Sequence, residues 1–363
     1  MRVVLVSRVR LNPYVDLLAQ GLAAGHDGLQ VTTAGTWSLP WLIRQRSRID
    51  LVHLHWLELF YTYPSAYLSA KRWLSSVAAI MACRRLGIGL VATVHNVSAH
   101  DGRWRPHDTW ANRLLYRRAD ALHVHDVQAQ REVVGAGADR RRVAVIPHGT
   151  YVGAYPDACT REEARRRLGL PQQAMVYLSL GLIRPYKGLE ALIQAFAALD
   201  RPQARLVIAG QVQDPGYAAQ LADLASGDVR VNFNPGYVPD DMLQHYFRAA
   251  DVAVLPYRAA TTSGAAYLAF SFEVPLIAPR LGPFPELAAD GRGVLYDPEA
   301  EGSLLLALRT AFELDIEAAR TACRAFNDAH DWQRLARRHA ALYRFALGRS
   351  SAASAGQVVE DAI

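Results

Sequence analysis

The chain has 363 residues, of which 51% are hydrophobic and 20% are charged, a composition typical of a soluble globular protein. Its length exceeds the size at which one hydrophobic core usually keeps growing, so two domains are expected. The net charge of +6 comes without a basic stripe interleaved with aromatic residues; it permits anionic ligands or a membrane surface and argues against nucleic acid as a partner.

The amino-terminal half alternates short apolar runs with helical patterns. Several runs are apolar on both faces, as parallel strands covered by helices should be. The predicted strands are Val3–Ser7, Leu29–Thr33, Leu51–His55, Leu90–Val94, Ala121–Val124 and Val143–Ile146. These repeated βα units predict a doubly wound α/β domain, which we place at residues 1–155.

The start of the chain predicts a strand and no signal peptide, because Arg8 and Arg10 interrupt the apolar run early. No uninterrupted apolar run reaches the ~20 residues that span a bilayer. Three scattered cysteines, Cys83, Cys159 and Cys323, favour a reducing compartment and no metal cluster. We therefore expect a cytoplasmic protein.

A helix predicted at Ala66–Leu86 combines apolar residues with four cations. These are Tyr67, Leu68, Trp73, Leu74, Ile80 and Met81 with Lys71, Arg72, Arg84 and Arg85. Such a helix can lie on anionic lipid, which would make the protein peripheral to the membrane. It can equally pack one face on a sheet and leave its cations in water. The pattern favours packing and leaves both interpretations open.

Residues 152–172 change in character, and Thr160 to Glu163 has the spacing of a capping box before a short arginine-rich helix. The βα pattern then resumes. The predicted strands are Val176–Leu180, Leu206–Ala209, Val229–Phe233, Val252–Leu255, Leu276–Ala278 and Val294–Tyr296. A second α/β domain is expected at 156–330, facing the first across a cleft at the open ends of the two sheets.

The loop from Gly181 to Gly188 joins the strand Val176–Leu180 to a helix that begins near Leu189. Free backbone N–H groups and the helix dipole suit an anion at such a junction. Arg184 and Lys187 add a fork of donors and a mobile point charge. The loop therefore indicates a diphosphate site, although an ordinary βα turn with two solvated cations has the same local pattern.

The end of the chain predicts one amphipathic helix and a tail. From Trp332 to Leu347, apolar residues follow one side of the helix, and His339 interrupts that stripe. Residues 348–363 are rich in Ser, Ala and Gly, so we expect a flexible tail there.

Five motifs together resemble a GT-B glycosyltransferase of the family-four type found in bacterial polysaccharide and glycolipid assembly. They are Val145–Gly149, Gly181–Gly188, Ala249–Pro256, Val274–Ala278 and Pro285–Leu287. The resemblance covers nearly the whole chain. It implies two Rossmann-like domains facing a central cleft, with the acceptor on the first domain and the nucleotide-sugar donor on the second. It also implies that the helix at 331–347 returns to the first domain.

The resemblance assigns Arg184 and Lys187 to the donor diphosphate, with no metal or other cofactor. Fixed cations there would stabilise the charge that develops on a departing nucleoside diphosphate. Gly181, at the start of the same loop, is expected to contact the donor as well. A second phosphate cradle is expected at residues 261–265, with Thr262, Ser263 and Gly264; read alone, that segment is also a helix cap. The nucleobase is expected near residues 234–237, which include Tyr237.

The sequence departs from the family pattern at two positions. Ala260 and Leu268 stand where family-four enzymes usually carry two glutamates. Related transferases resembling β-mannosyltransferases also lack the pair, so an active enzyme is expected. Two alternatives remain: a noncatalytic nucleotide-sugar-binding partner of another transferase, and a nucleotide-sugar epimerase on the same fold.

The first domain supplies candidates for the acceptor side. His95 ends a strand and resembles the histidine that GT-B enzymes place over the transferred sugar. Trp56 and Glu58, at the end of another strand, are expected to border the acceptor. His53 and His55 share one face of that strand, but no set of carboxylates or cysteines accompanies them to complete a metal site.

If the reaction inverts configuration, a general base must take the proton of the acceptor hydroxyl. The candidates are Glu58, His95, His100 and Asp101, with Asp16 a weaker one. The resulting hypothesis is a metal-independent glycosyltransferase that moves a sugar from a UDP- or GDP-linked donor to a saccharide or lipid-linked acceptor.

Overall fold

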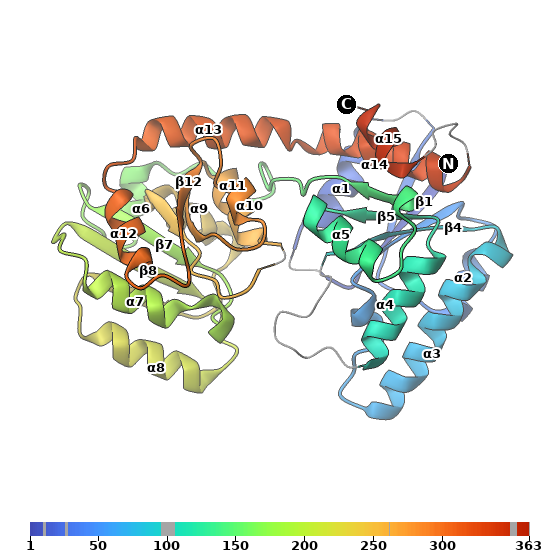
Figure 1. Cartoon of the computed structure of the whole chain (residues 1–363), viewed down its shortest axis with the longest axis horizontal. Helices are drawn as coiled ribbons and strands as arrows, with labels where there is room; N and C mark the ends of the chain where they lie inside the picture. Colours follow the sequence, from blue (N-terminus) through green and yellow to red (C-terminus); the bar gives the residue numbers. More distant parts are fainter. Residues whose placement is uncertain (10–11, 26–27, 96–105, 261, 349–353, 363) are drawn as a thin grey trace. The chain divides into compact units, whose positions relative to one another are not determined.

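A computed structural model describes the chain except for residues 10–11, 26–27, 96–105, 261, 349–353 and 363 (Figure 1). The chain forms two compact units. Unit 1 comprises Met1–Gly149 and His330–Ile363, and unit 2 comprises Thr150–Ala329. Residues 150–155, which we expected in the first domain, belong to unit 2; the Tyr151 amide there donates to Ser271 Oγ at 2.7 Å.

Unit 1 is built on a parallel sheet with the strand order β2-β1-β3-β4-β5-β6. Its strands are β1 (Arg2–Val6), β2 (Gln30–Ala34), β3 (Leu51–His55), β4 (Gly89–Thr93), β5 (Ala121–Val124) and β6 (Val143–Val145). Its helices are α1 (Tyr14–Gly25), α2 (Leu39–Gln45), η1 (Leu57–Phe60), α3 (Ala66–Ala82), η2 (Arg84–Leu86), α4 (Pro106–Arg118), α5 (Val127–Gly135), η3 (Arg140–Arg142), α14 (Trp332–Ala346) and α15 (Ala355–Glu360). The predicted parallel α/β architecture of this half is confirmed.

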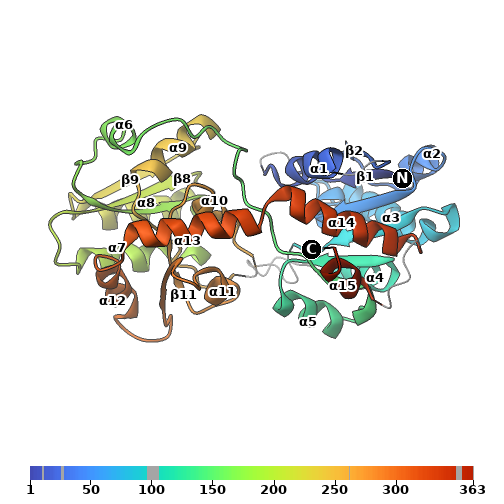
Figure 2. The same cartoon turned by 90° about the horizontal axis from the view of Figure 1, so that it is seen from above.

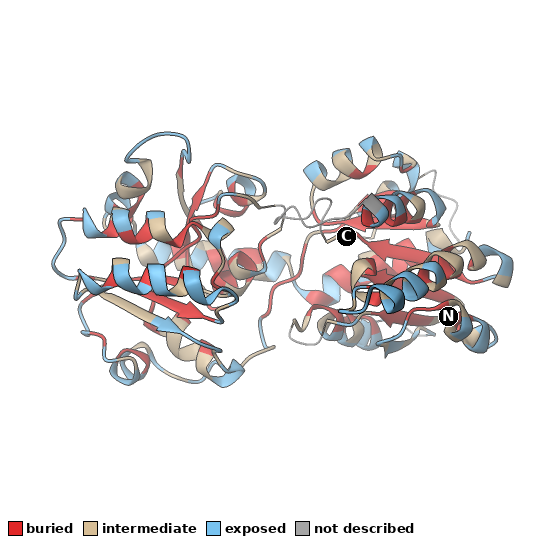
Figure 3. Ribbon diagram, turned by 90° about the horizontal axis from the view of Figure 1, so that it is seen from below, coloured by how far each residue is buried: buried red, intermediate tan, exposed pale blue. Residues whose placement is uncertain are grey.

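Alternate residues of each strand in unit 1 enter two different cores, since side chains alternate across a strand. Val3 and Leu5 of β1 pack with α1, α14 and α15. Val4 and Val6 pack instead with the core formed by α2, α3, α4 and α5. Helices therefore cover both faces of the sheet, and its strands other than the edge strand β2 are largely buried while the outer sides of the helices are exposed (Figure 3).

Unit 2 contains a second parallel sheet in the order β12-β11-β10-β7-β8-β9. Its strands are β7 (Met175–Leu180), β8 (Ala204–Gly210), β9 (Val231–Pro235), β10 (Val252–Val254), β11 (Leu276–Pro279) and β12 (Gly293–Tyr296). Its helices are α6 (Arg161–Arg167), η4 (Pro185–Lys187), α7 (Leu189–Ala197), α8 (Pro215–Ser226), α9 (Asp240–Ala249), α10 (Gly264–Ser271), α11 (Phe284–Leu287), α12 (Ser303–Thr310) and α13 (Ile316–Ala329). The capping box predicted at Thr160 and Glu163 starts α6.

One predicted strand begins later than expected. Val229 was placed in a strand, but its side chain is 98% exposed and β9 starts at Val231. The cause is a local turn: Asp228 accepts from the Arg230 amide at 2.9 Å and forms an ion pair with the Arg230 guanidinium at 2.6 Å. These bonds hold Val229 outside the sheet.

The last helices pack on unit 1. Helix α14 lies beside α1 (Figure 2), and Trp332 at its start approaches the backbone at Gly21 and Gly149 so closely that a Cβ at either position would collide with it. Asp331 caps α14 by accepting from the Gln333 amide at 2.8 Å. Our expectation of a flexible tail is wrong for α15, because Ala355 and other apolar residues of that helix are buried in the same core.

Helix α3 packs one side into the core, as the sequence favoured. Ala79 and Ile80 are buried there with Cys83, while residues near the start of the helix are exposed. No helix among the described residues is both long enough and apolar enough to cross a membrane.

Histidines concentrate on the sheet face that α1 and α14 cover. Among the described residues, the buried histidines are His53, His55, His123, His125, His148 and His339, and His95 lies partly buried beside them. Burial lowers the pKa of every one of these imidazoles, and nearby histidines lower most of them further. The pKa falls to about 3 for His55 and to about 4 for His148 and His339. The folded protein therefore holds these rings neutral.

This cluster predicts a steep loss of stability in mild acid. The same histidines titrate near pH 6.5 once the chain unfolds, so only the unfolded state takes up their protons as the pH falls below that value. Each ring then lowers the free energy of unfolding by about 1.4 kcal/mol per pH unit until its folded pKa is reached. Urea unfolding at a series of pH values between 8 and 5 measures this slope, with His107→Gln on an exposed histidine as the control. An unfolding free energy that stays constant from pH 7 to pH 5.5 would contradict the prediction.

Candidate functional site

The candidate residues of unit 1 follow the carboxyl ends of neighbouring parallel strands. Trp56 comes directly after β3, His95 lies two residues beyond β4, and His125 follows β5. Because the carboxyl ends of parallel strands meet at one edge of a sheet, these residues lie together there. This edge is where α/β proteins usually bind ligands.

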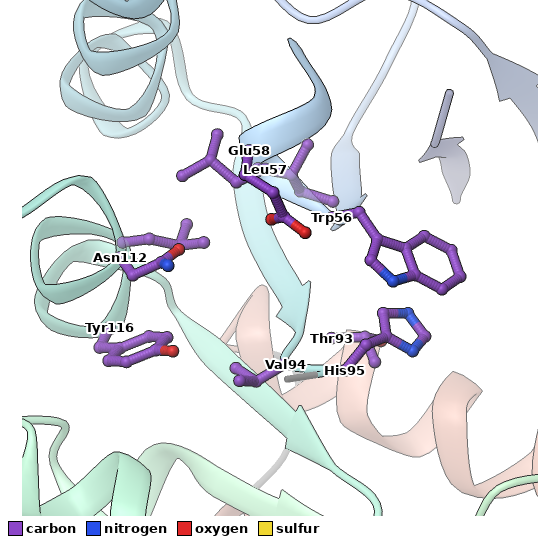
Figure 4. A pocket seen from close by; sticks show the side chains of 10 residues that line it. Trp56, Leu57, Glu58, Thr93, Val94, His95, Asn112 and Tyr116 are labelled. Atoms are coloured by element: carbon purple, nitrogen blue, oxygen red, sulfur yellow. The ribbon is translucent and has the colours of Figure 1, made fainter. Parts of the chain in front are cut away.

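Trp56 and His95 form a stacked pair. Their ring centroids are 3.6 Å apart and the rings are within 5° of parallel (Figure 4). Trp56 has φ 48°, a left-handed conformation that costs a non-glycine residue of order 1–3 kcal/mol and is concentrated at functional sites. The turn at Trp56 therefore sets the indole against the imidazole at a cost in backbone strain.

Glu58 enters a small pocket beside this pair. The cavity is about 20 Å³, room for about one water, and Asn112 and Tyr116 of α4 line its other side (Figure 4). Burial raises the pKa of the Glu58 carboxyl, and the charge of Asp108 raises it further. A carboxyl with a raised pKa, set in a pocket that polar and apolar side chains line together, is suited to exchange a proton with a hydroxyl group.

One set of histidine hydrogen bonds is fixed by a backbone carbonyl. His123 Nε2 lies 2.8 Å from the Ile146 carbonyl, which can only accept, so Nε2 carries the proton. Its Nδ1 must then accept from the Thr93 hydroxyl at 2.9 Å, and Thr93 Oγ1 accepts from His53 Nε2 at 2.7 Å. His53 Nδ1 finally accepts from the Tyr343 hydroxyl at 2.8 Å. This anchored chain has one tautomeric arrangement and ties α14 to the sheet.

A second chain, which we call the unanchored chain, contains His95; within the described residues neither of its outer nitrogens makes a hydrogen bond to a backbone carbonyl. His95 Nε2 lies 3.0 Å from His55 Nδ1, and His95 Nδ1 lies 3.3 Å from His125 Nε2. The outer nitrogens, His55 Nε2 and His125 Nδ1, are buried and make no hydrogen bond within the described part of the chain. Two opposite tautomeric arrangements satisfy the inner bonds equally, because each neutral ring has one donor and one acceptor. This unanchored chain can shift its protons without acquiring net charge.

The histidine cluster extends well beyond what the sequence indicated. His53 and His55 do share a face, with ring centroids 4.2 Å apart. In the ranges that the structure describes, no group of three or more His, Cys, Asp and Glu is arranged to hold a metal ion. His123 and His125, which the sequence did not single out, repeat the alternation of His53 and His55 two strands later, at β5. His339, which interrupts the apolar stripe of α14, faces this cluster.

The glycines of the loop in unit 2 lie where the backbone packs closely against itself. Gly181 has φ 137° and its amide donates to the Ala209 carbonyl at 3.0 Å. A Cβ at Gly210, at the end of β8, would collide with the Gly181 carbonyl. Gly188, with φ 63°, is equally confined by the Pro256 carbonyl and starts α7. Glycine is therefore required at each of these positions.

Arg184 and Lys187 lie in this loop, and neither charge is paired with a carboxylate in the described residues. Arg184 Nε is buried and makes no hydrogen bond to any residue that the structure describes. Lys187 Nζ donates to the Tyr257 hydroxyl at 2.8 Å, and burial lowers the pKa of its ammonium, with the charge of Arg184 adding to the effect. A bound anion would satisfy the Arg184 donor and relieve the desolvated Lys187 charge.

The segment proposed as a second phosphate cradle lies before α10. Ser263 Oγ accepts from the Ala266 amide at 3.3 Å, so its oxygen caps the helix, while Thr262 and Gly264 flank it. Leu268, at the position where the family usually carries its second glutamate, lies on α10 and is partly buried. Tyr237 is exposed two residues beyond β9.

Three other residues were candidates for the general base. Asp101 and His100 lie outside the described residues. Asp16 is exposed on the first turn of α1. Of the proposed proton acceptors, the structure therefore brings Glu58 and His95 together at one pocket.

Comparisons with known proteins agree with this fold. The family model described as glycosyl transferases group 1 matches residues 160–328, and that of glycosyltransferase family 4 matches residues 11–152. A D-inositol 3-phosphate glycosyltransferase from Streptomyces scabiei is 30% identical over 331 residues, covering 83% of this chain and 68% of the relative. A GDP-mannose:glycolipid 4-beta-D-mannosyltransferase from Xanthomonas campestris pv. campestris is 28% identical over 314 residues, covering 85% of this chain and 83% of the relative.

Solved structures show the same architecture. Sucrose-phosphate synthase from Thermosynechococcus elongatus has a TM-score of 0.75 at 19% identity, with 96% of this chain and 100% of that chain covered. Anabaena HepE in complex with UDP has a TM-score of 0.69 at 18% identity, with 94% of this chain and 98% of that chain covered. The predicted resemblance is confirmed: the chain belongs to the family-four type of GT-B glycosyltransferases.

Proposed function

We propose that this glycosyltransferase moves a hexose from a nucleoside diphosphate sugar to a saccharide or lipid-linked acceptor, with the donor bound by unit 2 and the acceptor by unit 1. The observation that carries the proposal is the pair of cations in the glycine loop, Arg184 and Lys187, whose charges meet no carboxylate among the described residues. A diphosphate supplies negative charge for both cations and an acceptor for the buried Arg184 Nε.

Loss of the diphosphate is the step that this loop serves. As the glycosidic bond to the leaving phosphate breaks, negative charge develops on the phosphate oxygens. Arg184 and Lys187 stabilise that charge more than the ground state, together with the amides at the starts of α7 and α10. In this proposal the two cations supply the charge that a metal ion would otherwise supply.

GDP-mannose is the first donor to test, followed by UDP-linked hexoses. The Xanthomonas relative is named as a GDP-mannose:glycolipid transferase, while solved structures of the same fold are complexes with UDP or UDP-glucose. These names support the donor class and leave the choice of nucleobase to experiment.

On the acceptor side, we assign Glu58 the role of receiving the proton of the attacking hydroxyl. Its carboxyl enters the pocket beside Trp56 and His95, and its raised pKa favours proton uptake. Trp56 offers an aromatic face to the sugar ring. His95, held between His55 and His125, can pass a proton along the unanchored chain.

Replacing both loop cations, as Arg184→Ala with Lys187→Ala, is expected to weaken nucleoside diphosphate binding at least about a hundredfold, because two charge-assisted contacts are lost. Thermal stabilisation by UDP, GDP, ADP, CMP and dTDP measures the loss, since a ligand that binds only the folded state raises its stability. Arg309→Ala, on the exposed side of α12, is the matched control and should keep the shift. A double variant that retains the full shift would refute the donor-site assignment.

Replacing Glu58 with glutamine is expected to reduce sugar transfer by about 10²–10⁴-fold, the usual contribution of a general base. Binding of the nucleotide should not change, because the variant leaves the glycine loop intact. The wild-type rate should also rise with pH on the acid side as Glu58 deprotonates, and that limb should disappear in the variant. Asp16→Asn on exposed α1 provides the comparison, and a Glu58→Gln enzyme as active as that comparison would exclude the role.

A further inference from the structure

Tyr257, three residues beyond β10, contacts the Lys187 ammonium in two ways. Lys187 Nζ donates to the Tyr257 hydroxyl at 2.8 Å and lies 4.7 Å from the centroid of the Tyr257 ring. The tyrosine is buried and its ring packs edge-on against Phe284, with centroids 5.6 Å apart. Nζ also lies 3.1 Å from the place that a Cβ at Gly181 would occupy. The phenol therefore holds the charged end of Lys187 close to the first residue of the glycine loop.

The backbone on each side of Tyr257 is joined to the glycine loop. On one side, the Arg258 amide donates to the Tyr186 carbonyl at 2.8 Å. On the other, the Pro256 carbonyl lies so close to Gly188 that a Cβ there would collide with it. A side chain fixed by packing and by its backbone neighbours can orient a flexible partner. Tyr257 is therefore a rigid support for Lys187, although 70 residues separate the two in the chain.

The Tyr257 hydroxyl has a second partner in the segment before α10. Burial raises the pKa of this phenol, so it stays protonated, and a hydrogen bond with the Ser263 side chain opposes that rise. A neutral phenol both donates and accepts, so it can accept from Lys187 and donate to Ser263 at the same time. Ser263 is buried, and its oxygen also accepts from the Ala266 amide at the start of α10. One hydroxyl thus connects the loop that carries Lys187 with the start of α10.

Ordering a lysine at the moment of binding costs affinity, because its long side chain must give up rotational freedom. In the protein without donor, Lys187 already has a fixed partner. That partner occupies one of the three N–H donors of the ammonium and leaves two for phosphate oxygens. We propose that Tyr257 is a positioning residue of the donor site, which sets the Lys187 ammonium in place for the diphosphate before the donor binds. The inference rests on the function proposed above and adds a residue to its donor site.

Tyr257→Phe tests this role, because it removes the hydroxyl and keeps the ring. Calorimetric titration of the full chain with GDP and GMP, and with UDP and UMP, should show about tenfold weaker binding of the diphosphate to the variant, since Lys187 loses a charge-assisted hydrogen bond that orders it. The monophosphate of the same base should bind as it does to the wild type, because Lys187 is proposed to contact the second phosphate. A variant that only disturbs the fold of unit 2 would weaken both ligands, and that result would overturn the inference.

A double-mutant cycle with Lys187→Met separates positioning from a direct contact between Tyr257 and the donor. If Tyr257 acts through Lys187, adding Tyr257→Phe to Lys187→Met should weaken diphosphate binding no further. Losses that multiply in the double variant would contradict the inference. Tighter diphosphate binding by Tyr257→Phe would contradict it as well, because the phenol would then compete with phosphate for the ammonium.

Tyr177→Phe is the matched control. Tyr177 is also buried in unit 2, and its hydroxyl donates to the Leu308 carbonyl at 2.6 Å, so the same atom is removed away from Lys187. This control should bind the diphosphate as the wild type does, and a loss as large as that of Tyr257→Phe would overturn the inference.

Single variants of the loop cations distinguish failure of this inference from failure of the donor site. If Arg184→Ala weakens diphosphate binding and Tyr257→Phe does not, the donor site stands and Tyr257 has no positioning role. If the wild type binds neither diphosphate, or if neither Arg184→Ala nor Lys187→Met weakens binding, the donor site fails and this inference fails with it.

Discussion

The parallel arrangement of both sheets is the constraint on which the rest of the structure depends. In each sheet every strand ends at the same edge, so residues that follow different strands are brought together there. In unit 1 this edge gathers Trp56, Glu58 and His95; in unit 2 it gathers the glycine loop with Lys187 and the segment before α10. Both groups of candidate site residues therefore follow from the parallel order of the strands.

Burial of uncharged imidazoles shapes the core of unit 1. The anchored chain runs in one direction from the Tyr343 hydroxyl to the Ile146 carbonyl, so it fixes α14 against the sheet. The unanchored chain through His95 lies on the same face but ends in nitrogens that no described residue satisfies. The two chains therefore differ in how firmly their hydrogen bonds are oriented, although they lie side by side on one face of the sheet.

Local signals were predictable from the sequence, and long-range partners were not. The glycine loop could be predicted because a strand, two glycines and two cations are consecutive in the chain. The error at Val229 came from a turn that Asp228 and Arg230 hold, which apolar patterning does not reveal. The histidine cluster could not be predicted, because its contacts join residues as far apart in the chain as His53 and Tyr343, 290 positions.

We have proposed that the glycine loop of unit 2 binds a diphosphate. Calorimetric titration of the unmodified protein with a matched nucleoside, nucleoside monophosphate and nucleoside diphosphate tests it most directly. If Arg184 and Lys187 contact the second phosphate, the diphosphate should bind at least about tenfold more tightly than the monophosphate. Equal affinities for the two would show that the loop does not recognise a diphosphate and would contradict the account.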